Sequence, residues 1–235
     1  MDAADIVGVI QILEAESIPQ CLVGELALNY YNVPRVLHDL EVCVPNDSLV
    51  AAKSIFLQRP QLFQSVPHSN INVYTEYKSG FPRFRYLPRP NAYIVLFPDT
   101  HFYLDPLAAS VIPRQNGLSL HTYSPEIGDF ISPSDILSLP LPRLGPFFSG
   151  FCRRYCRSGD LMAAIAAEQL ADGMDLDEDW YRSHIPLPWS EESQFALSLV
   201  AGKAERVSDL LTPAVARQMS HQHVGWEVKS ILGRD

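Results

Sequence analysis

Two carboxylates, Asp39 and Glu41, lie two residues apart in an apolar segment of the sequence. Side chains two apart on a β-strand point to the same face, so this spacing predicts two carboxylates side by side. Such a pair can bind a divalent cation, because Mg²⁺ prefers oxygen ligands, and a single carboxylate can act as a general base. The alternative is a solvated strand face on which the two side chains have no catalytic role.

A glycine turn precedes this pair. The apolar residues 20–23 lead into Gly24 and Glu25, and 13 residues follow before Asp39. The pattern predicts a short strand, a turn at Gly24, a helix over 25–31 and a second strand over 36–44. The turn and the carboxylates would then lie close together, with the helix N-terminus available to a phosphate group.

A basic and aromatic segment, KSGFPRFRYLPR, covers residues 78–89 and contains no acidic residue. Arginines such as Arg83 and Arg85 can bind phosphate, and the interleaved aromatic rings can stack on bases. The whole chain has 18 Lys and Arg against 27 Asp and Glu, a net charge of −9, which disfavours a general nucleic-acid-binding surface. A local basic path suits the acceptor end of a tRNA, so we expect no DNA partner. A charged edge strand is the alternative.

The order of strand, Gly24, helix and Asp-x-Glu strand resembles the nucleotidyltransferase superfamily. That resemblance implies a small mixed sheet with packed helices, followed by a helical part, and a third carboxylate from a later strand. Asp105, at the end of HFYLD, is the candidate, with Asp99 as the alternative. Asp39, Glu41 and Asp105 would then hold Mg²⁺ for transfer from a nucleoside triphosphate. Glu25 departs from the pattern, because the family has Gly or Ser there and a carboxylate repels a triphosphate unless it is neutralised.

A narrower resemblance extends over PRFRY, SLPLPRL and LADGMDLDEDW. With the Gly24 strand, these segments resemble fungal proteins with a degenerate nucleotidyltransferase core, among them the arginine-containing cyclodipeptide synthases. The resemblance implies synthesis of a diketopiperazine from arginyl-tRNA and a second aminoacyl-tRNA in secondary metabolism, with essential acidic residues. Asp39 and Glu41 are the positions that correspond.

Ester aminolysis requires neither ATP nor a metal, so no cofactor is expected for such a synthase. A carboxylate acting as general base on the arginyl α-amine would contribute ~10²- to 10⁴-fold. Glu25, Asp39 and Glu41 would form an acidic pocket for the guanidinium, with Gly24 beside them, while Arg83 and Arg85 would hold tRNA phosphate. An inactive nucleotidyltransferase fold kept as a binding module is the remaining hypothesis.

The elements that must position these residues fall into three parts. The chain has 235 residues, 47% of them hydrophobic, which suits one domain or two small ones that share a core. We predict a nucleotidyltransferase-like α/β core over 1–110, a proline-rich connection over 111–146 and a helical region over 147–235. Further strands are expected over 72–77, 82–86, 92–97 and 102–104, and a helix near the start of the chain.

Several sequence features bear on location. No apolar run has the length that a membrane-spanning helix requires, and the first residues are acidic where a signal peptide would be basic. The four cysteines are scattered, which is typical of reduced structural thiols. We therefore expect a cytoplasmic protein with no membrane partner. The second amino acid of a product and the oligomeric state stay open.

Overall fold

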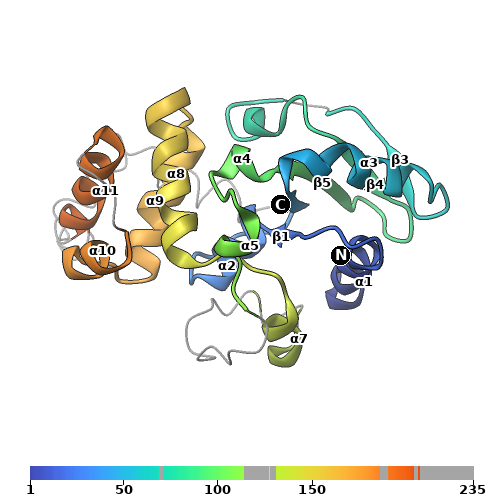
Figure 1. The fold of residues 1–235 in the computed structure, drawn as a ribbon, viewed down its shortest axis with the longest axis horizontal. Helices are drawn as coiled ribbons and strands as arrows, with labels where there is room; N and C mark the ends of the chain where they lie inside the picture. Colours follow the sequence, from blue (N-terminus) through green and yellow to red (C-terminus); the bar gives the residue numbers. More distant parts are fainter. Residues whose placement is uncertain (69–70, 114–126, 128–130, 186–189, 204–205, 207–235) are drawn as a thin grey trace, which may run out of the picture.

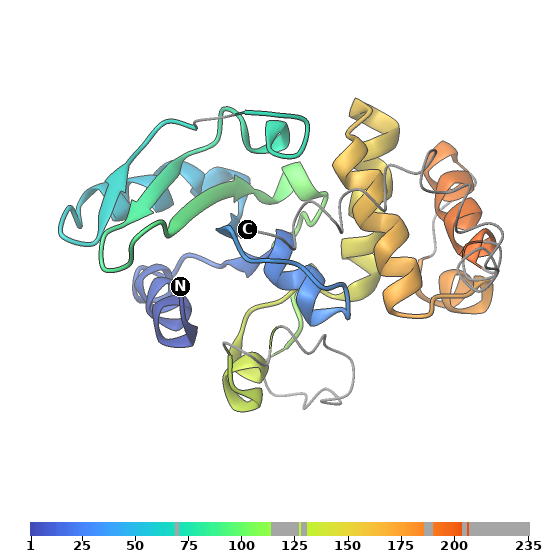
Figure 2. The ribbon, with the colours of Figure 1, turned by 180° about the vertical axis from the view of Figure 1, so that it is seen from behind.

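The computed structural model describes residues 1–68, 71–113, 127, 131–185, 190–203 and 206. A five-stranded mixed sheet with packed helices forms one side of the molecule, and the C-terminal helices form the other (Figure 1). The view from behind shows the same two-part arrangement (Figure 2). The expected α/β class, with a helical part after the sheet, is confirmed.

The sheet has the strand order β1-β2-β5-β4-β3. Its strands are β1 (Cys21–Leu22), β2 (Asp39–Val44), β3 (Phe63–Ser65), β4 (Arg83–Tyr86) and β5 (Tyr93–Pro98). Only the pairing of β2 with β5 is parallel, and all other neighbours are antiparallel. Every residue of β2 is buried, which agrees with a central strand covered on both faces.

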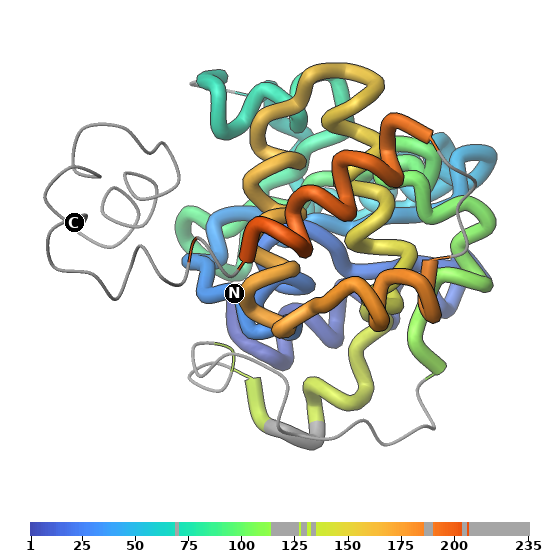
Figure 3. The backbone as a smooth tube through the Cα atoms, turned by 90° about the vertical axis from the view of Figure 1, so that its left-hand side faces the viewer, coloured from blue at the N-terminus to red at the C-terminus, as the bar shows by residue number. Residues whose placement is uncertain are grey.

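The helices lie on the sheet and beyond it. Those that accompany the sheet are α1 (Ala3–Ala15), α2 (Gly24–Tyr30), η1 (Asn46–Ser48), α3 (Leu49–Leu57), η2 (Glu76–Lys78), α4 (Asp99–Phe102) and α5 (Leu107–Ser110). Those that follow are α7 (Pro133–Ser138), α8 (Leu144–Ser158), α9 (Leu161–Gly173), α10 (Glu178–His184) and α11 (Glu191–Ala201). Figure 3 views the molecule from the side of the C-terminal helices. None of the described helices is both long and apolar enough to span a membrane.

Two predicted strands are wrong. Residues 72–77 form turns that lead into η2, because the Asn72 side chain accepts a hydrogen bond from the Tyr74 backbone and Thr75 bonds back to the Asn72 backbone. Residue 102 ends the short helix α4, and Tyr103 adopts a left-handed conformation with φ of 53°. The strands expected over 82–86 and 92–97 are present as β4 and β5, whereas β3 was not expected.

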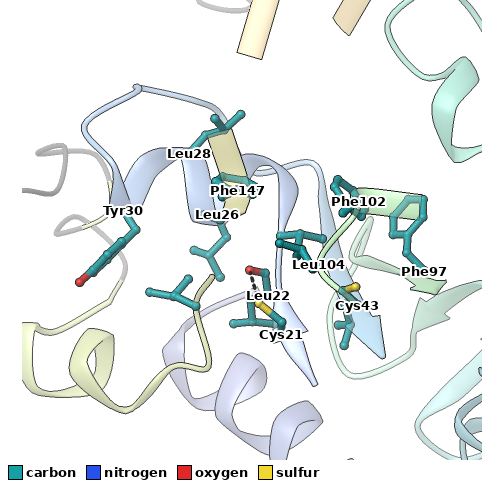
Figure 4. Packing of buried hydrophobic residues seen from close by; sticks show 14 of the residues in the cluster. Cys21, Leu22, Leu26, Leu28, Tyr30, Cys43, Phe97, Phe102, Leu104 and Phe147 are labelled. Atoms are coloured by element: carbon teal, nitrogen blue, oxygen red, sulfur yellow. Dashed lines mark hydrogen bonds between the residues drawn. The ribbon is translucent and has the colours of Figure 1, made fainter. Parts of the chain in front are cut away.

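A continuous core joins the sheet to the helices that follow it. The Phe97 ring of β5 contacts the Phe102 ring of α4 edge to face, with centroids 5.2 Å apart, and both are seen in Figure 4. Phe102 in turn contacts Phe151 of α8 at 6.3 Å. These aromatic contacts fix α8 against the end of β5.

Candidate functional site

A cavity of about 590 Å³ opens between the sheet and the helices α8 and α9. Its wall combines charged groups with aromatic and apolar side chains. The residues that line it are Gly24, Glu25, Leu28, Arg35, His38, Asp39, Glu41, Asn72, Tyr74, Thr75, Tyr77, Lys78, Arg83, Tyr93, Phe102, Phe151, Arg154, Met162, Ala163 and Ala166. The strand-to-helix turn, β2, β4, η2 and the C-terminal helices therefore all contribute to one site.

Gly24 brings the start of α2 against the carboxylate of Glu41. Its φ is +61°, in the left-handed region that favours glycine. A Cβ atom at this position would lie 2.1 Å from Glu41 Oε2. The absence of a side chain at Gly24 therefore lets Glu41 reach the turn.

Asp39 and Glu41 point to one side of β2, as the spacing predicted, and both hold the same lysine. Lys78 Nζ lies 2.9 Å from Asp39 Oδ2 and 2.9 Å from Glu41 Oε1. The Tyr77 hydroxyl donates to Glu41 Oε1 at 2.5 Å, and Arg83 Nη2 donates to Asp39 Oδ1 at 3.2 Å. These five side chains form a buried ion network at the floor of the cavity.

The network shifts the pKa values of the two carboxylates in opposite directions. Burial raises the pKa of Glu41, and the Lys78 ammonium opposes this only in part. Burial acts in the same direction on Asp39, but Lys78 and then Arg83 hold the pKa of Asp39 below its ordinary value. Burial alone would lower the pKa of Lys78, but Glu41 and Asp39 together raise it. Lys78 is therefore charged at neutral pH.

Glu25 and His38 form a second pair at the rim of the cavity. Glu25 Oε1 lies 2.8 Å from His38 Nδ1, and Glu25 Oε2 accepts the His38 backbone N–H at 2.6 Å. The His38 side chain is 50% exposed, against 19% for that of Glu25. The hydrogen bond to Glu25 raises the pKa of His38, although partial burial acts against it.

The structure brings together most of the residues singled out from the sequence. Gly24, Glu25, Asp39, Glu41 and Arg83 all line the cavity. It is not the acidic pocket we expected, however, because each of the three carboxylates already has a basic partner. The cations among its lining residues (Arg35, Lys78, Arg83 and Arg154) outnumber the carboxylates.

The two candidate phosphate-binding arginines differ in environment. The guanidinium of Arg83 lies 3.8 Å from the centre of the Tyr93 ring and binds Asp39, so this side chain is turned into the network. Arg85 is exposed and donates to the Tyr93 hydroxyl at 3.3 Å. Of the two, Arg85 is therefore the one that an external phosphate can reach.

The third carboxylate that we expected does not reach the pair. Asp105 is exposed and does not line the cavity. Asp99 is buried directly after β5, where it accepts the Asn46 backbone N–H at 3.0 Å. In the parallel register Asp39 lies opposite Tyr93, at the other end of β5 from Asp99. The residue opposite Glu41 is Val95, so β5 supplies no carboxylate there.

The residues of the site do not fit a divalent metal ion. The Lys78 ammonium takes the position between Asp39 and Glu41 that a shared cation would need. In the part of the chain that the structure describes, no cluster of three or more His, Cys, Asp or Glu side chains could hold a metal. A mechanism that requires Mg²⁺ on this pair is therefore not supported by the side chains present.

Sequence reasoning missed the importance of His38, Tyr77 and Lys78. The sequence showed Lys78 only as one charge in a basic segment. Its partners lie 37 and 39 residues away along the chain, and the turns before η2 determine its position. The sequence held one local signal: Glu25 departs from the Gly or Ser of the nucleotidyltransferase pattern. The structure shows that its carboxylate contacts His38.

Comparisons with known proteins add little to this site. No protein-family model matches the sequence, and no curated protein matches it. The solution structure of the antibiotic-resistance factor ANT(2'')-Ia, a nucleotidyltransferase, is similar over 94% of this chain and 100% of that chain. Its sequence identity is 8% and the TM-score is 0.42, values that carry no argument about activity. The assignment of the α/β fold rests on the strand order and the Gly24 turn described above.

Proposed function

We propose that this chain is a metal-independent transferase that joins two tRNA-borne aminoacyl groups into an arginine-containing cyclic dipeptide. The observation that carries the proposal is the position of Lys78, 2.9 Å from each carboxylate of the pair. An internal cation at that place supports chemistry that needs no metal. Aminolysis of an ester is such chemistry, because the aminoacyl group is already activated.

The reaction needs positioning and the removal of a proton. The α-amine of one aminoacyl group attacks the ester carbon of the other, which forms a C–N bond and breaks the C–O bond to the tRNA ribose. The remaining amine then attacks the second ester in the same way and closes the ring. Holding two reactants in a near-attack geometry can contribute ~7–11 kcal/mol to such a step.

The composition of the cavity supports a substrate with both a charged and an apolar part. Lys78, Arg83 and Arg154 are paired with carboxylates. Arg35, which bonds to the neutral side chain of Gln169, and exposed Arg85, next to the site on β4, are therefore the groups that suit the phosphates at the acceptor end of a tRNA. Tyr74 and Phe151 offer ring faces, and Met162 offers apolar surface. Among the carboxylates Glu25 has the most exposed side chain, so it is the group available to a guanidinium.

The test is a reconstituted reaction with tRNA that has been charged beforehand and purified away from ATP and Mg²⁺. Labelled arginyl-tRNA is mixed with pools of other aminoacyl-tRNAs, with EDTA present, and cyclic dipeptides are measured by mass spectrometry. We expect a labelled cyclo-Arg-X product, whose mass identifies X. Asp39→Asn should lower the rate by at least about tenfold, because it weakens the pairing with Lys78 and Arg83.

Asp47→Asn is the matched control, because Asp47 is exposed in η1 and does not line the cavity. Its rate should equal that of the wild type. The absence of any cyclic dipeptide from folded wild-type protein would refute the proposal. Incorporation of labelled nucleotide from a triphosphate in the presence of Mg²⁺ would favour nucleotidyl transfer instead, and inactivity in both assays would favour a binding module.

A further inference from the structure

The Glu25–His38 pair has a geometry suited to proton transfer. One carboxylate holds both the ring Nδ1 and the backbone N–H of His38, at 2.8 and 2.6 Å. The backbone contact holds the Glu25 carboxylate beside His38, and the ring contact orients the imidazole. The ring contact also favours the tautomer in which Nδ1 carries the hydrogen and Nε2 carries a lone pair.

The other nitrogen of the ring is available to a ligand. His38 lines the cavity with half of its side chain exposed, and its Nε2 atom makes no hydrogen bond within the described ranges. A base must lie within hydrogen-bond reach of the proton that it removes. Among the described lining residues, His38 is the only histidine.

The carboxylates of the floor are poorly placed for the same task. Glu41 is 1% exposed, with Oε1 bound to Tyr77 and Lys78 and Oε2 against Gly24. Both oxygens of Asp39 accept from a cation. An approaching amine would have to displace these partners, whereas it can reach His38 directly.

The surroundings of His38 adjust its basicity. Glu25 of α2 and Asp39 of β2 raise the pKa of the imidazole, while partial burial and Lys78 of η2 lower it, and the net direction is upward. A raised pKa makes His38 a stronger base. It also means that the neutral, active form is reached at a higher pH than for an isolated histidine.

We propose that His38 is the catalytic base of this site and that Glu25 is its positioning residue. The inference rests on the proposed function. His38 Nε2 accepts the proton from the attacking α-amine as the C–N bond forms, and then donates it to the ribose oxygen as the C–O bond breaks. This assignment also gives a role to Glu25, whose carboxylate departs from the Gly or Ser of the nucleotidyltransferase pattern. Each of its oxygens keeps a second lone pair, so orienting His38 does not prevent contact with a guanidinium.

The test is the pH–rate profile of cyclic dipeptide formation from charged tRNA, for the wild type and three variants. His38→Gln should lower the rate by about 10²- to 10⁴-fold. His38→Gly should recover part of its lost rate when imidazole is added, because the half-exposed position is accessible. Glu25→Gln should move the rising limb of the profile to lower pH, because the pKa of His38 falls when the carboxylate is removed.

His184→Gln is the control, since His184 is exposed on α10 and does not line the cavity. Thermal unfolding should establish that each variant is folded. If the wild type forms product while His38→Gln keeps its rate and profile, the assignment of His38 is overturned and the proposed function stands. If the folded wild type forms no product, both are overturned. The assignment is also overturned if imidazole does not restore the rate of His38→Gly and the rising limb of Glu25→Gln does not shift. His38 would then have a structural role only.

Discussion

A single hydrogen atom on Gly24 occupies the space where any side chain would meet Glu41. The Cβ of an alanine would lie 2.1 Å from Glu41 Oε2, and the φ of +61° adds a conformational cost of roughly 1–2 kcal/mol. We predict that Gly24→Ala lowers the free energy of unfolding by more than this conformational cost, because the ion network must also shift. Urea denaturation followed by circular dichroism measures the change.

Two other glycines separate the causes. Gly80 also has a positive φ, of +84°, but no atom lies within 4 Å of its would-be Cβ, so Gly80→Ala should show the conformational cost alone. Gly8 is in the helix α1 with open space around it, and Gly8→Ala should stabilise the protein by about 1 kcal/mol. Equal losses for Gly24→Ala and Gly80→Ala would mean that the contact with Glu41 has no energetic effect.

The position of Asp39 and Glu41 on one face of a strand was predictable from the sequence, whereas the position of Lys78 between them was not. The alternation of a strand is local, so two carboxylates at i and i+2 can be assigned to one face from the sequence. Lys78 reaches them through turns at residues 72–75, whose hydrogen bonds involve the Asn72 side chain. Such a conformation depends on side-chain contacts that a periodic pattern does not contain.

Among the elements, α8 and α9 close the cavity against the sheet part, and α8 packs directly on α4. A Cβ at Gly150 would lie 2.2 Å from the carbonyl oxygen of Phe102, so this position of α8 leaves no room for a side chain. We predict that Gly150→Ala pushes α8 away from α4 and lowers the free energy of unfolding by roughly 1–3 kcal/mol. The same variant should lose cyclic dipeptide synthesis, because Phe151 and Arg154 of α8 line the cavity.

Gly145 in the same helix provides the control. Its would-be Cβ lies 3.3 Å from the His184 carbonyl oxygen, which requires only a small adjustment. Gly145→Ala should leave the free energy of unfolding within about 1 kcal/mol of the wild type. A Gly150→Ala protein as stable and active as Gly145→Ala would show that the position of α8 does not matter to the site.

The elements with a regular hydrophobic pattern were the ones that could be predicted from the sequence. The strand at 92–97 and the helical character of 147–235 were predictable, because buried residues recur with the period of their element. The strand expected over 102–104 is instead the end of the four-residue helix α4 and the turn after it, because four residues are too few to show a helical period. The last part of the helical region expected over 147–235, residues 207–235, lies outside the described residues.

The molecule as a whole places its site between regions that the sequence suggested treating separately. We expected a core over 1–110 and a helical region over 147–235, and the described part of both contributes to one cavity. Within the described lining, Glu25 and Lys78 come from the first region, while Arg154 and Met162 come from the second. The catalytic hypothesis therefore concerns both regions, since residues 1–110 do not supply the complete described lining.

Overall charge determines how such a molecule would bind RNA. With a net charge of −9, the molecule as a whole repels phosphate, so we expect binding to depend on a few cations near the cavity. We predict that the affinity for tRNA falls with rising salt. The slope of log K against log salt is therefore negative, and Arg85→Gln should make it less steep by about 1. Arg182→Gln is the control, because Arg182 pairs with Glu178 on α10 and does not line the cavity. Fluorescence anisotropy with labelled tRNA at several salt concentrations measures both slopes. An Arg85→Gln slope equal to that of the wild type would show that Arg85 does not contact tRNA phosphate, because each lost phosphate contact must reduce counterion release.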